Sequence, residues 1–220
     1  MDVCLEADSI IKSFGGRLIL SDIYLRCISG DIIAIWGRNG SGKTTLFRIL
    51  YGTLKAERSY IQINGQLVTG KAYKTGQIAC LPQVNYLPKE MIVRDVIQLV
   101  CGNKYRGLGD KQIQRIYDSR IRNLSGGELR YLEILLLLES DAPFILLDEP
   151  FNKLSPVMVE QVIEYIRLNK QRKGIILSDH NYQAIKKVAN KHMLLKEGYL
   201  KSMDDVEELE NIYLRKSRNL

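Results

Sequence analysis

The segment Gly37 to Thr44 constrains the fold of this chain more than any other part of its sequence. It reads G-R-N-G-S-G-K-T, which satisfies the phosphate-loop pattern G-x-x-x-x-G-K-[ST]. The apolar run Ile32 to Trp36 precedes it as a strand candidate, and Thr45 to Tyr51 follows with helical spacing. Because a strand, this loop and a helix in that order begin a P-loop NTPase core, we predict an α/β fold.

The loop is predicted to bind the triphosphate of a nucleotide. Its glycines let the backbone bend around the phosphates, and the N–H groups and the helix N-terminus face the negative charge. Lys43 is expected to reach the β and γ phosphates, and Thr44 to bind Mg²⁺. The expected contacts are Gly37, Arg38, Asn39, Gly40, Ser41, Gly42, Lys43, Thr44 and Thr45. The alternative is a glycine-rich turn without a ligand, and the two flanking elements argue against it.

The first third of the chain is also predicted to form an antiparallel β edge. Val3 to Ser13 and Arg17 to Cys27 are strand-like runs. A tight hairpin is expected across Asn64 and Gly65, because this dipeptide suits a turn with positive φ angles.

A small helical lobe is predicted after that edge. From Tyr86 to about Leu138 the spacing becomes helical. Its apolar positions include Ile92, Val96, Leu99 and Val100. We place this lobe at about residues 86–140, inserted in the α/β core of a single domain over residues 1–220.

The last third has the order of a parallel sheet with crossover helices. The strand candidate Phe144 to Leu147 is followed by a helix from about Pro156 to Asn169 and a second apolar strand, Gly174 to Leu177. We therefore predict that the core sheet is parallel.

Two carboxylates end the first of these strands and are predicted to act on the phosphates. Asp148 would hold Mg²⁺ at the sheet edge, while the adjacent Glu149 would polarise the attacking water. A buried strand that simply ends in a charged turn is the alternative interpretation. The phosphate loop in the same chain favours the catalytic one.

The segment Leu124 to Glu128 reads L-S-G-G-E and opens an apolar helix. Ser125 and Glu128 form the S-x-x-E pattern of a capping box. A capped helix explains these two residues but not Gly126 and Gly127, since glycine destabilises a helix by about 1 kcal/mol. We therefore expect the glycines to let the backbone approach a ligand closely.

With these motifs in this order, the sequence resembles the ABC ATPase family over nearly its whole length. L-S-G-G-E is the family signature, and the resemblance implies that Ser125, Gly126 and Gly127 contact the γ-phosphate of an ATP held by the other protomer. Gln83, in L-P-Q, matches the glutamine loop that touches Mg²⁺ and the water in this family. Without the resemblance, Gln83 would read as a surface residue.

Two further residues acquire roles from the resemblance. His180, in S-D-H-N after a strand, looks like the switch histidine that binds the γ-phosphate. Phe14 stands where the family carries an aromatic residue that stacks on adenine, although a strand-end phenylalanine is often part of a core.

Local strings narrow the resemblance loosely. The residues around Glu149 and His180 are similar to those in the ATPases of lipopolysaccharide export and branched-chain amino acid uptake. The chain departs from the family pattern at Ser155, where an aspartate is usual, and its helical lobe is short. The first departure bears on the hydrolysis rate and the second on the partner.

The resemblance implies an ATP-binding and ATP-hydrolysing subunit of a membrane transporter. Two copies would dimerise around two Mg-ATP and drive transmembrane permease subunits. A soluble ABC ATPase that acts on nucleic acid or ribosomes is the alternative, and the net charge of +7 would suit it. That alternative is disfavoured because the chain lacks the paired cassettes or added modules of such proteins. A non-catalytic ATP sensor is a third possibility.

Composition bears on where such a subunit would work. No run approaches the roughly 20 apolar residues that span a bilayer, and the first residues do not resemble an export signal. The four cysteines are far apart in sequence and form no C-x-x-C pair. We expect a cytoplasmic protein that sits peripherally at the inner face of the cell membrane.

Overall fold

The computed structural model describes residues 3–82, 84–102, 105, 109–203, 205 and 209. Its central sheet has six strands in the order β10-β9-β3-β8-β7-β6. Strands β3, β6, β7, β8 and β9 run parallel, and β10 is antiparallel to β9. Their bounds are β3 Ile32–Trp36, β6 Ile78–Leu81, β7 Phe144–Asp148, β8 Gly174–Ser178, β9 Lys191–Lys196 and β10 Tyr199–Ser202. This arrangement confirms the predicted parallel core.

A second, antiparallel sheet has the order β2-β1-β4-β5. Its strands are β1 Cys4–Phe14, β2 Arg17–Ile28, β4 Arg58–Ile63 and β5 Gln66–Leu67. The predicted hairpin joins β4 to β5, with φ angles of 53° at Asn64 and 75° at Gly65. Positive φ at both turn residues is what a type I′ turn requires.

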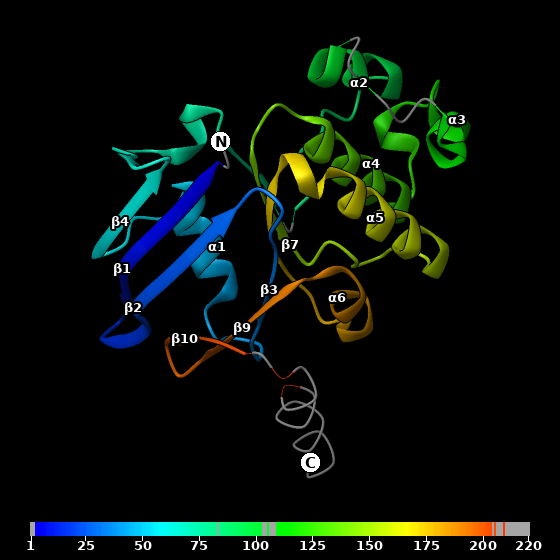
Figure 1. Cartoon of the computed structure of the whole chain (residues 1–220). Coiled ribbons are helices and arrows are strands. Elements are labelled where there is room, and N and C mark those ends of the chain that lie inside the picture. Colours follow the sequence, from blue (N-terminus) through cyan, green and yellow to red (C-terminus); the bar gives the residue numbers. More distant parts are fainter. Residues whose placement is uncertain are drawn as a thin grey trace.

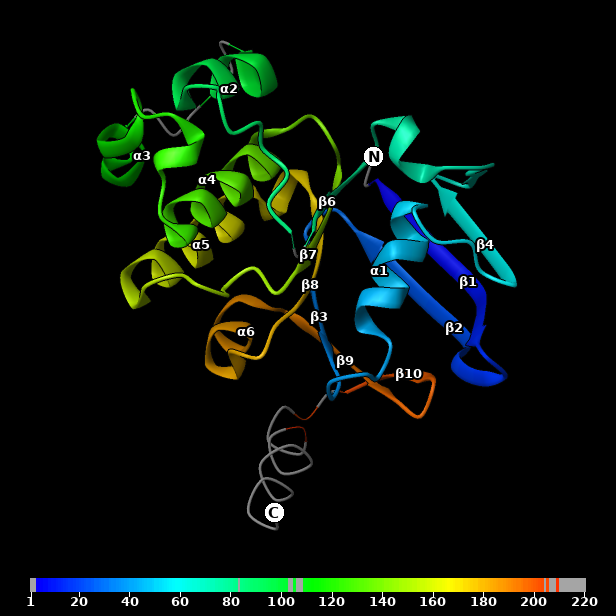
Figure 2. The same ribbon diagram turned by 180° about the vertical axis from the view of Figure 1, so that it is seen from behind.

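Helices pack on both faces of the central sheet (Figures 1 and 2). The α-helices are α1 Lys43–Tyr51, α2 Val93–Cys101, α3 Lys111–Ile116, α4 Gly126–Glu139, α5 Pro156–Asn169 and α6 Tyr182–Val188. Short 3₁₀ helices span Ala72–Thr75, Ile121–Asn123 and Lys170–Arg172. Helix α1 lies between the two sheets, while α4, α5 and α6 cover the opposite face.

Alternation along the central strands divides the interior into two cores. Ile33 and Ile35 of β3 belong to the core that α1 and the antiparallel sheet share. Ile32, Ala34 and Trp36 of the same strand face the core on the side of α4, α5 and α6. Both faces of the strand are thus buried, as expected for parallel sheets.

Trp36 ends β3 directly before the phosphate loop. Its indole is buried, donates from Nε1 to Nδ1 of His192 at 3.1 Å, and stacks on Tyr182 with 5.4 Å between ring centroids and 8° between ring planes. This stack connects β3 to the first residue of α6.

The structure corrects one expectation about the helical region. Leu99 and Val100 were expected on the apolar face of α2, but 75% of Leu99 and 44% of Val100 are exposed. The buried residues of this helix are Val93, Val96, Ile97 and Cys101.

The boundaries of a lobe at residues 86 and 140 stay a prediction. In the described ranges, no helix has both the length and the apolar character needed to cross a membrane.

Candidate functional site

The phosphate loop joins β3 to α1 and is built around glycines that no other residue could replace without strain. Gly40 and Gly42 have φ angles of 77° and 109°, in the region that side chains disfavour. A Cβ atom on Gly37 would lie 2.4 Å from Oγ of Ser41, and one on Gly42 would lie 3.0 Å from Ile19. The loop therefore curls tightly over the start of α1.

Lys43 is held by the loop that it follows. Its ammonium donates to the carbonyl oxygen of Gly37 and to that of Arg38, the latter at 3.2 Å. Only 8% of Lys43 is exposed, and this burial lowers the pKa of the amine, while Asp148 and Glu149 act in the opposite direction. An anion in front of the loop would stabilise the charged amine, because opposite charge favours the ionised form.

Asp148 at the end of β7 meets the first turn of α1. Thr44 Oγ1 donates to Asp148 Oδ2 at 2.8 Å, and Ser178 Oγ donates to Oδ1 at 3.0 Å. Burial raises the pKa of Asp148, and these two hydrogen bonds lower it. Ser178 ends the neighbouring strand β8 and is paired in register with Asp148. The pairing of β7 with β8 therefore positions the Ser178 hydroxyl beside the Asp148 carboxylate.

The pair Thr44 and Asp148 suits Mg²⁺. This ion prefers oxygen ligands and takes only one or two carboxylates from the protein, with the remaining positions filled by phosphate oxygens and water. Within the described part of the chain, no cluster of three or more histidine, cysteine, aspartate or glutamate residues is placed to hold a metal. Thr44 and Asp148 therefore fit an ion whose remaining ligands are phosphate oxygens and water.

Glu149 and His180 face each other beside Asp148. His180 Nε2 lies 3.4 Å from Glu149 Oε1, and the Asn152 amide donates to Oε2 at 3.4 Å. Glu149 has a φ of 51°, which is uncommon for a residue with a side chain. The carboxylate is thus presented from a strained backbone position.

Most of the predicted site residues line one cavity of about 530 Å³. Its lining consists of Phe14, Ile19, Asn39, Gly40, Ser41, Gly42, Lys43, Thr44, Thr45, Glu149 and His180. Phe14 is 47% exposed, and the Lys12 ammonium lies 4.9 Å from the centre of its ring. Phe14 is therefore not part of a core, and Ile19 is an apolar neighbour that the motif analysis missed.

The L-S-G-G-E segment lies apart from that lining. Among the residues that the structure describes, neither Ser125 nor either glycine borders the cavity. The capping box is confirmed: Glu128 N donates to Ser125 Oγ at 3.2 Å, and Ser125 N donates to Glu128 Oε2 at 2.9 Å. A Cβ atom on Gly127 would lie 2.7 Å from the carbonyl oxygen of Lys153. Close packing within the chain is thus one reason for this glycine, and the sequence did not reveal it.

Two other predicted positions have different outcomes. Gln83 lies outside the described residues, so its role stays a prediction. Ser155 caps α5 by accepting from Met158 N at 3.4 Å, with Pro156 at the first helical position. This is the helix cap that serine and proline favour.

Arg130 is a functional candidate that motif analysis missed. It projects from α4 and donates to the backbone carbonyl oxygens of Pro82, Asp148 and Glu149. A charged residue inside the apolar run of α4 is the only sequence signal that pointed to it.

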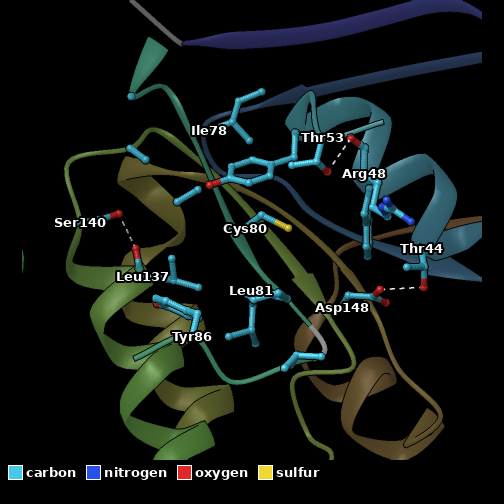
Figure 3. Close-up of a pocket in the computed structure, with 17 residues that line it drawn as sticks. Thr44, Arg48, Thr53, Ile78, Cys80, Leu81, Tyr86, Leu137, Ser140 and Asp148 are labelled. Atoms are coloured by element: carbon cyan, nitrogen blue, oxygen red, sulfur yellow. Dashed lines mark hydrogen bonds between the residues drawn. The ribbon is translucent and has the colours of Figure 1, made fainter. Parts of the chain in front are cut away.

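A second, larger cavity of about 690 Å³ opens between α1, β6 and α4 (Figure 3). Ile78, Cys80 and Leu81 of β6 line one side, and Leu137 of α4 lies across from them. The Thr44–Asp148 pair lies at one end, so this mostly apolar cavity adjoins the phosphate site.

Comparison with known sequences matches the chain to one family model and to relatives that share one name. The sequence model described as "ABC transporter" matches residues 20–152. The lipopolysaccharide export system ATP-binding protein LptB of Escherichia coli (strain K12) is 30% identical over 214 residues, which cover 89% of this chain and 88% of that protein. The protein with the same name from Acidithiobacillus ferridurans is 25% identical and covers 95% and 93% of the two chains.

Solved structures show the same fold. An ATP-binding subunit of an ABC transporter superposes with a TM-score of 0.82 at 21% identity and covers 97% of this chain and 99% of that one. A bacterial Atm1-family ABC exporter with ATP bound also gives 0.82, at 19% identity, over all of this chain and 43% of the exporter. The predicted P-loop α/β fold, with its parallel sheet and antiparallel strands, is confirmed.

Proposed function

The chain belongs to the ABC transporter family and is an ATP-hydrolysing subunit of that kind, and from this premise we propose that two copies close around two Mg-ATP to drive membrane permease subunits. The observation that carries the proposal is that Lys43, Thr44, Glu149 and His180 line one cavity. Asp148 adjoins them through its hydrogen bond with Thr44. These side chains come from three segments, and each has a chemistry that phosphoryl transfer uses.

Each residue would act on a different part of the nucleotide. Lys43 places a positive charge on the β and γ phosphates, and the backbone N–H groups of residues 39–45 surround them. Thr44 and Asp148 would hold Mg²⁺, and this ion, when bound, would neutralise charge that develops on the phosphate oxygens. Phe14, beside Ile19, offers its exposed ring to the adenine.

Glu149 is the proposed general base. It accepts a proton from the attacking water, while His180 donates a hydrogen bond to the γ-phosphate. The 3.4 Å separation of Nε2 and Oε1 supports the proposal that both groups act on one γ-phosphate. A role for Gln83 as a ligand of Mg²⁺ and the water is proposed from its motif alone.

A homodimer would complete each site. Ser125 and Gly126 lie at the exposed start of α4, away from the cavity that Lys43 lines in the same chain. The dipole of a helix N-terminus favours an anionic ligand. We therefore propose that Ser125, Gly126 and Gly127 contact the γ-phosphate of the ATP bound by the partner subunit.

The cavity of Figure 3 would receive the permease. Its apolar lining suits one face of an amphipathic helix, and Arg48 and Tyr86 at its rim offer polar contacts. Because Asp148 and Thr44 lie at its inner end, a partner seated there would sense the state of the phosphate site. The proposed location is the inner face of the cell membrane.

The test is Glu149→Gln, which removes the base and keeps the shape of the side chain. ATP hydrolysis should fall by on the order of a hundredfold or more, while ATP binding is retained. Gel filtration with Mg-ATP should then show a trapped dimer. Glu160→Gln is the matched control, since Glu160 is exposed and pairs only with Lys187 in the described structure. A Glu149→Gln protein that stays monomeric at high concentration would argue against the closed dimer.

Membrane association is tested separately. The protein should be expressed together with any membrane protein that an adjacent gene encodes. It should then sediment with membranes and should not co-purify with ribosomes or DNA. Co-purification with ribosomes or DNA would instead support a soluble ATPase that acts on nucleic acid.

A further inference from the structure

Helix α4 carries two charged residues that are buried one turn apart. Arg130 is 5% exposed and Glu133 is 0% exposed, and Arg130 Nη1 lies 3.7 Å from Glu133 Oε2. Burying an ion pair is expensive in desolvation and is weak evidence for a gain in stability, so we ask what else the pair does.

The hydrogen bonds of Arg130 show what that role involves. Nη1 donates to the carbonyl oxygen of Pro82 at 2.6 Å, and Nη2 donates to those of Asp148 at 2.7 Å and Glu149 at 3.1 Å. The guanidinium therefore joins the helix that starts at the L-S-G-G-E segment to the backbone of Asp148, the proposed Mg²⁺ ligand, and of Glu149, the proposed base. Its planar arrangement of donors makes several such bonds possible at once.

Glu149 needs this support because of its backbone. Its φ of 51° is in the left-handed region, where a residue with a side chain persists only if its surroundings hold it. The N–H of Glu149 donates to the carbonyl oxygen of Ser178 at 2.8 Å, and its carbonyl oxygen accepts from Arg130. The same carbonyl oxygen also accepts from Asn152 N at 3.3 Å, so α4 provides one of three hydrogen bonds to the Glu149 backbone.

Glu133 binds a second segment. Tyr86 N donates to Glu133 Oε1 at 3.1 Å, and Pro82, which Arg130 contacts, precedes Tyr86 by four positions in the sequence. Figure 3 shows Tyr86 beside α4, next to the cavity proposed for the permease. One turn of α4 thus contacts that segment at two points.

We propose that Arg130 is a positioning residue for ATP hydrolysis, which couples the placement of the L-S-G-G-E helix to the direction of the Glu149 carboxylate. Glu133 orients the guanidinium and fixes Tyr86 to the same helix turn. The proposal rests on the proposed function of Glu149 as the base. Arg130 would touch neither ATP nor water, so its loss should change the rate of hydrolysis and not the affinity for ATP.

The test is Arg130→Lys, which keeps the charge but cannot reach all three carbonyl oxygens. We expect kcat to fall by about tenfold to a hundredfold, since small displacements of a catalytic group have effects of that size. The dissociation constant for ATP should stay within about twofold, as befits a residue without substrate contact. Arg167→Lys is the matched control, because exposed Arg167 also donates to a backbone carbonyl, that of Lys187. Unchanged kcat in Arg130→Lys would overturn the proposal.

A double variant separates positioning from folding. In the Glu149→Gln background, Arg130→Lys should cause no further loss in single-turnover release of labelled phosphate, because the group that it positions is gone. A further tenfold loss would mean a general structural role and would overturn the proposal.

If Arg130→Lys does not fold, Glu133→Gln serves instead, since it keeps an acceptor for Tyr86 N and removes the charge beside Arg130. Its kcat should fall at unchanged ATP affinity, and an unchanged kcat would overturn the proposal.

These outcomes distinguish the two proposals. Full activity in Glu149→Gln would refute the base itself. Loss of activity in Glu149→Gln with normal activity in Arg130→Lys would refute only the coupling through Arg130.

Discussion

The phosphate loop and the L-S-G-G-E segment are both glycine-containing helix starts, yet their surroundings differ. At the loop, Lys43 donates to carbonyl oxygens of the loop itself, and Thr44 reaches across to Asp148 of β7. At the second segment, the Ser125 side chain bonds only to Glu128, within its own capping box, in the described structure. One helix start thus belongs to a site assembled within the chain, while the other has an exposed first turn whose side-chain hydrogen bonds are local.

This difference indicates which substitutions should change ATP binding by a single chain and which should change only ATP hydrolysis. Changes at the phosphate loop should affect the affinity of a single chain for ATP. Changes at Ser125 should act only when two chains meet. Three substitutions test this contrast, beginning with the largest expected effect.

Lys43→Ala should abolish tight ATP binding and with it hydrolysis. Truncating a buried, hydrogen-bonded charge typically costs about 2–5 kcal/mol, which corresponds to at least roughly thirtyfold in affinity. Isothermal titration with ATP measures the loss, and Lys187→Ala, an exposed lysine paired with Glu160, is the control. Equal affinity in Lys43→Ala and the parent would contradict the assignment of the loop.

Ser125→Arg should abolish hydrolysis but leave ATP binding to the isolated chain nearly unchanged. The bulky charged side chain would block the closed dimer at an exposed helix start. Ser125→Ala is the control for the lost cap, which is worth about 1 kcal/mol, and it should keep more activity than the arginine variant. A large loss of ATP affinity in the single chain would mean that Ser125 acts on the nucleotide of its own chain. That result would contradict the proposed difference between the two helix starts.

Much of the phosphate-loop side of this contrast could be predicted from the sequence. The loop, the strand before it and the carboxylates after β7 follow from local patterns, and parallel strands bring their ends to one edge. The capping box of Ser125 and the Pro156–Asn169 helix are also local, so the structure reproduces them. Capping and turn preferences involve neighbouring residues and need no knowledge of the whole fold.

The features that could not be predicted depend on distant segments. Arg130 meets Glu149 only because the fold brings this side chain of α4 to the end of β7, and Gly127 lies against Lys153 for the same kind of reason. On α2, both Ile97 and Leu99 are apolar, and tertiary packing buries the first and exposes the second. Helical spacing alone identifies a helix but does not choose between two overlapping apolar faces.

Ser155→Asp has the smallest expected effect and sharpens the contrast between the two serine caps. Aspartate caps a helix as well as serine does, so the contact with Met158 N is preserved and only charge is added. An ionised acceptor at the proposed dimer seam would strengthen closure by about 2 kcal/mol, roughly thirtyfold, if two hydrogen bonds each gain about 1 kcal/mol. We therefore expect a higher ATPase rate and stronger ATP-dependent dimerisation. Unchanged rate and dimerisation in parallel assays would show that Ser155 is only a cap.

The stack of Trp36 on Tyr182 makes the site observable by intrinsic fluorescence. Trp36 is the single tryptophan of the chain, one residue before Gly37, and Tyr182 follows His180 by two residues. Indole emission depends on the ring stacked against it and on its hydrogen bond to His192. Any relative movement of the phosphate loop and the His180 segment would therefore change the emission of an unlabelled protein, so that nucleotide binding and hydrolysis can be followed in real time at their own location.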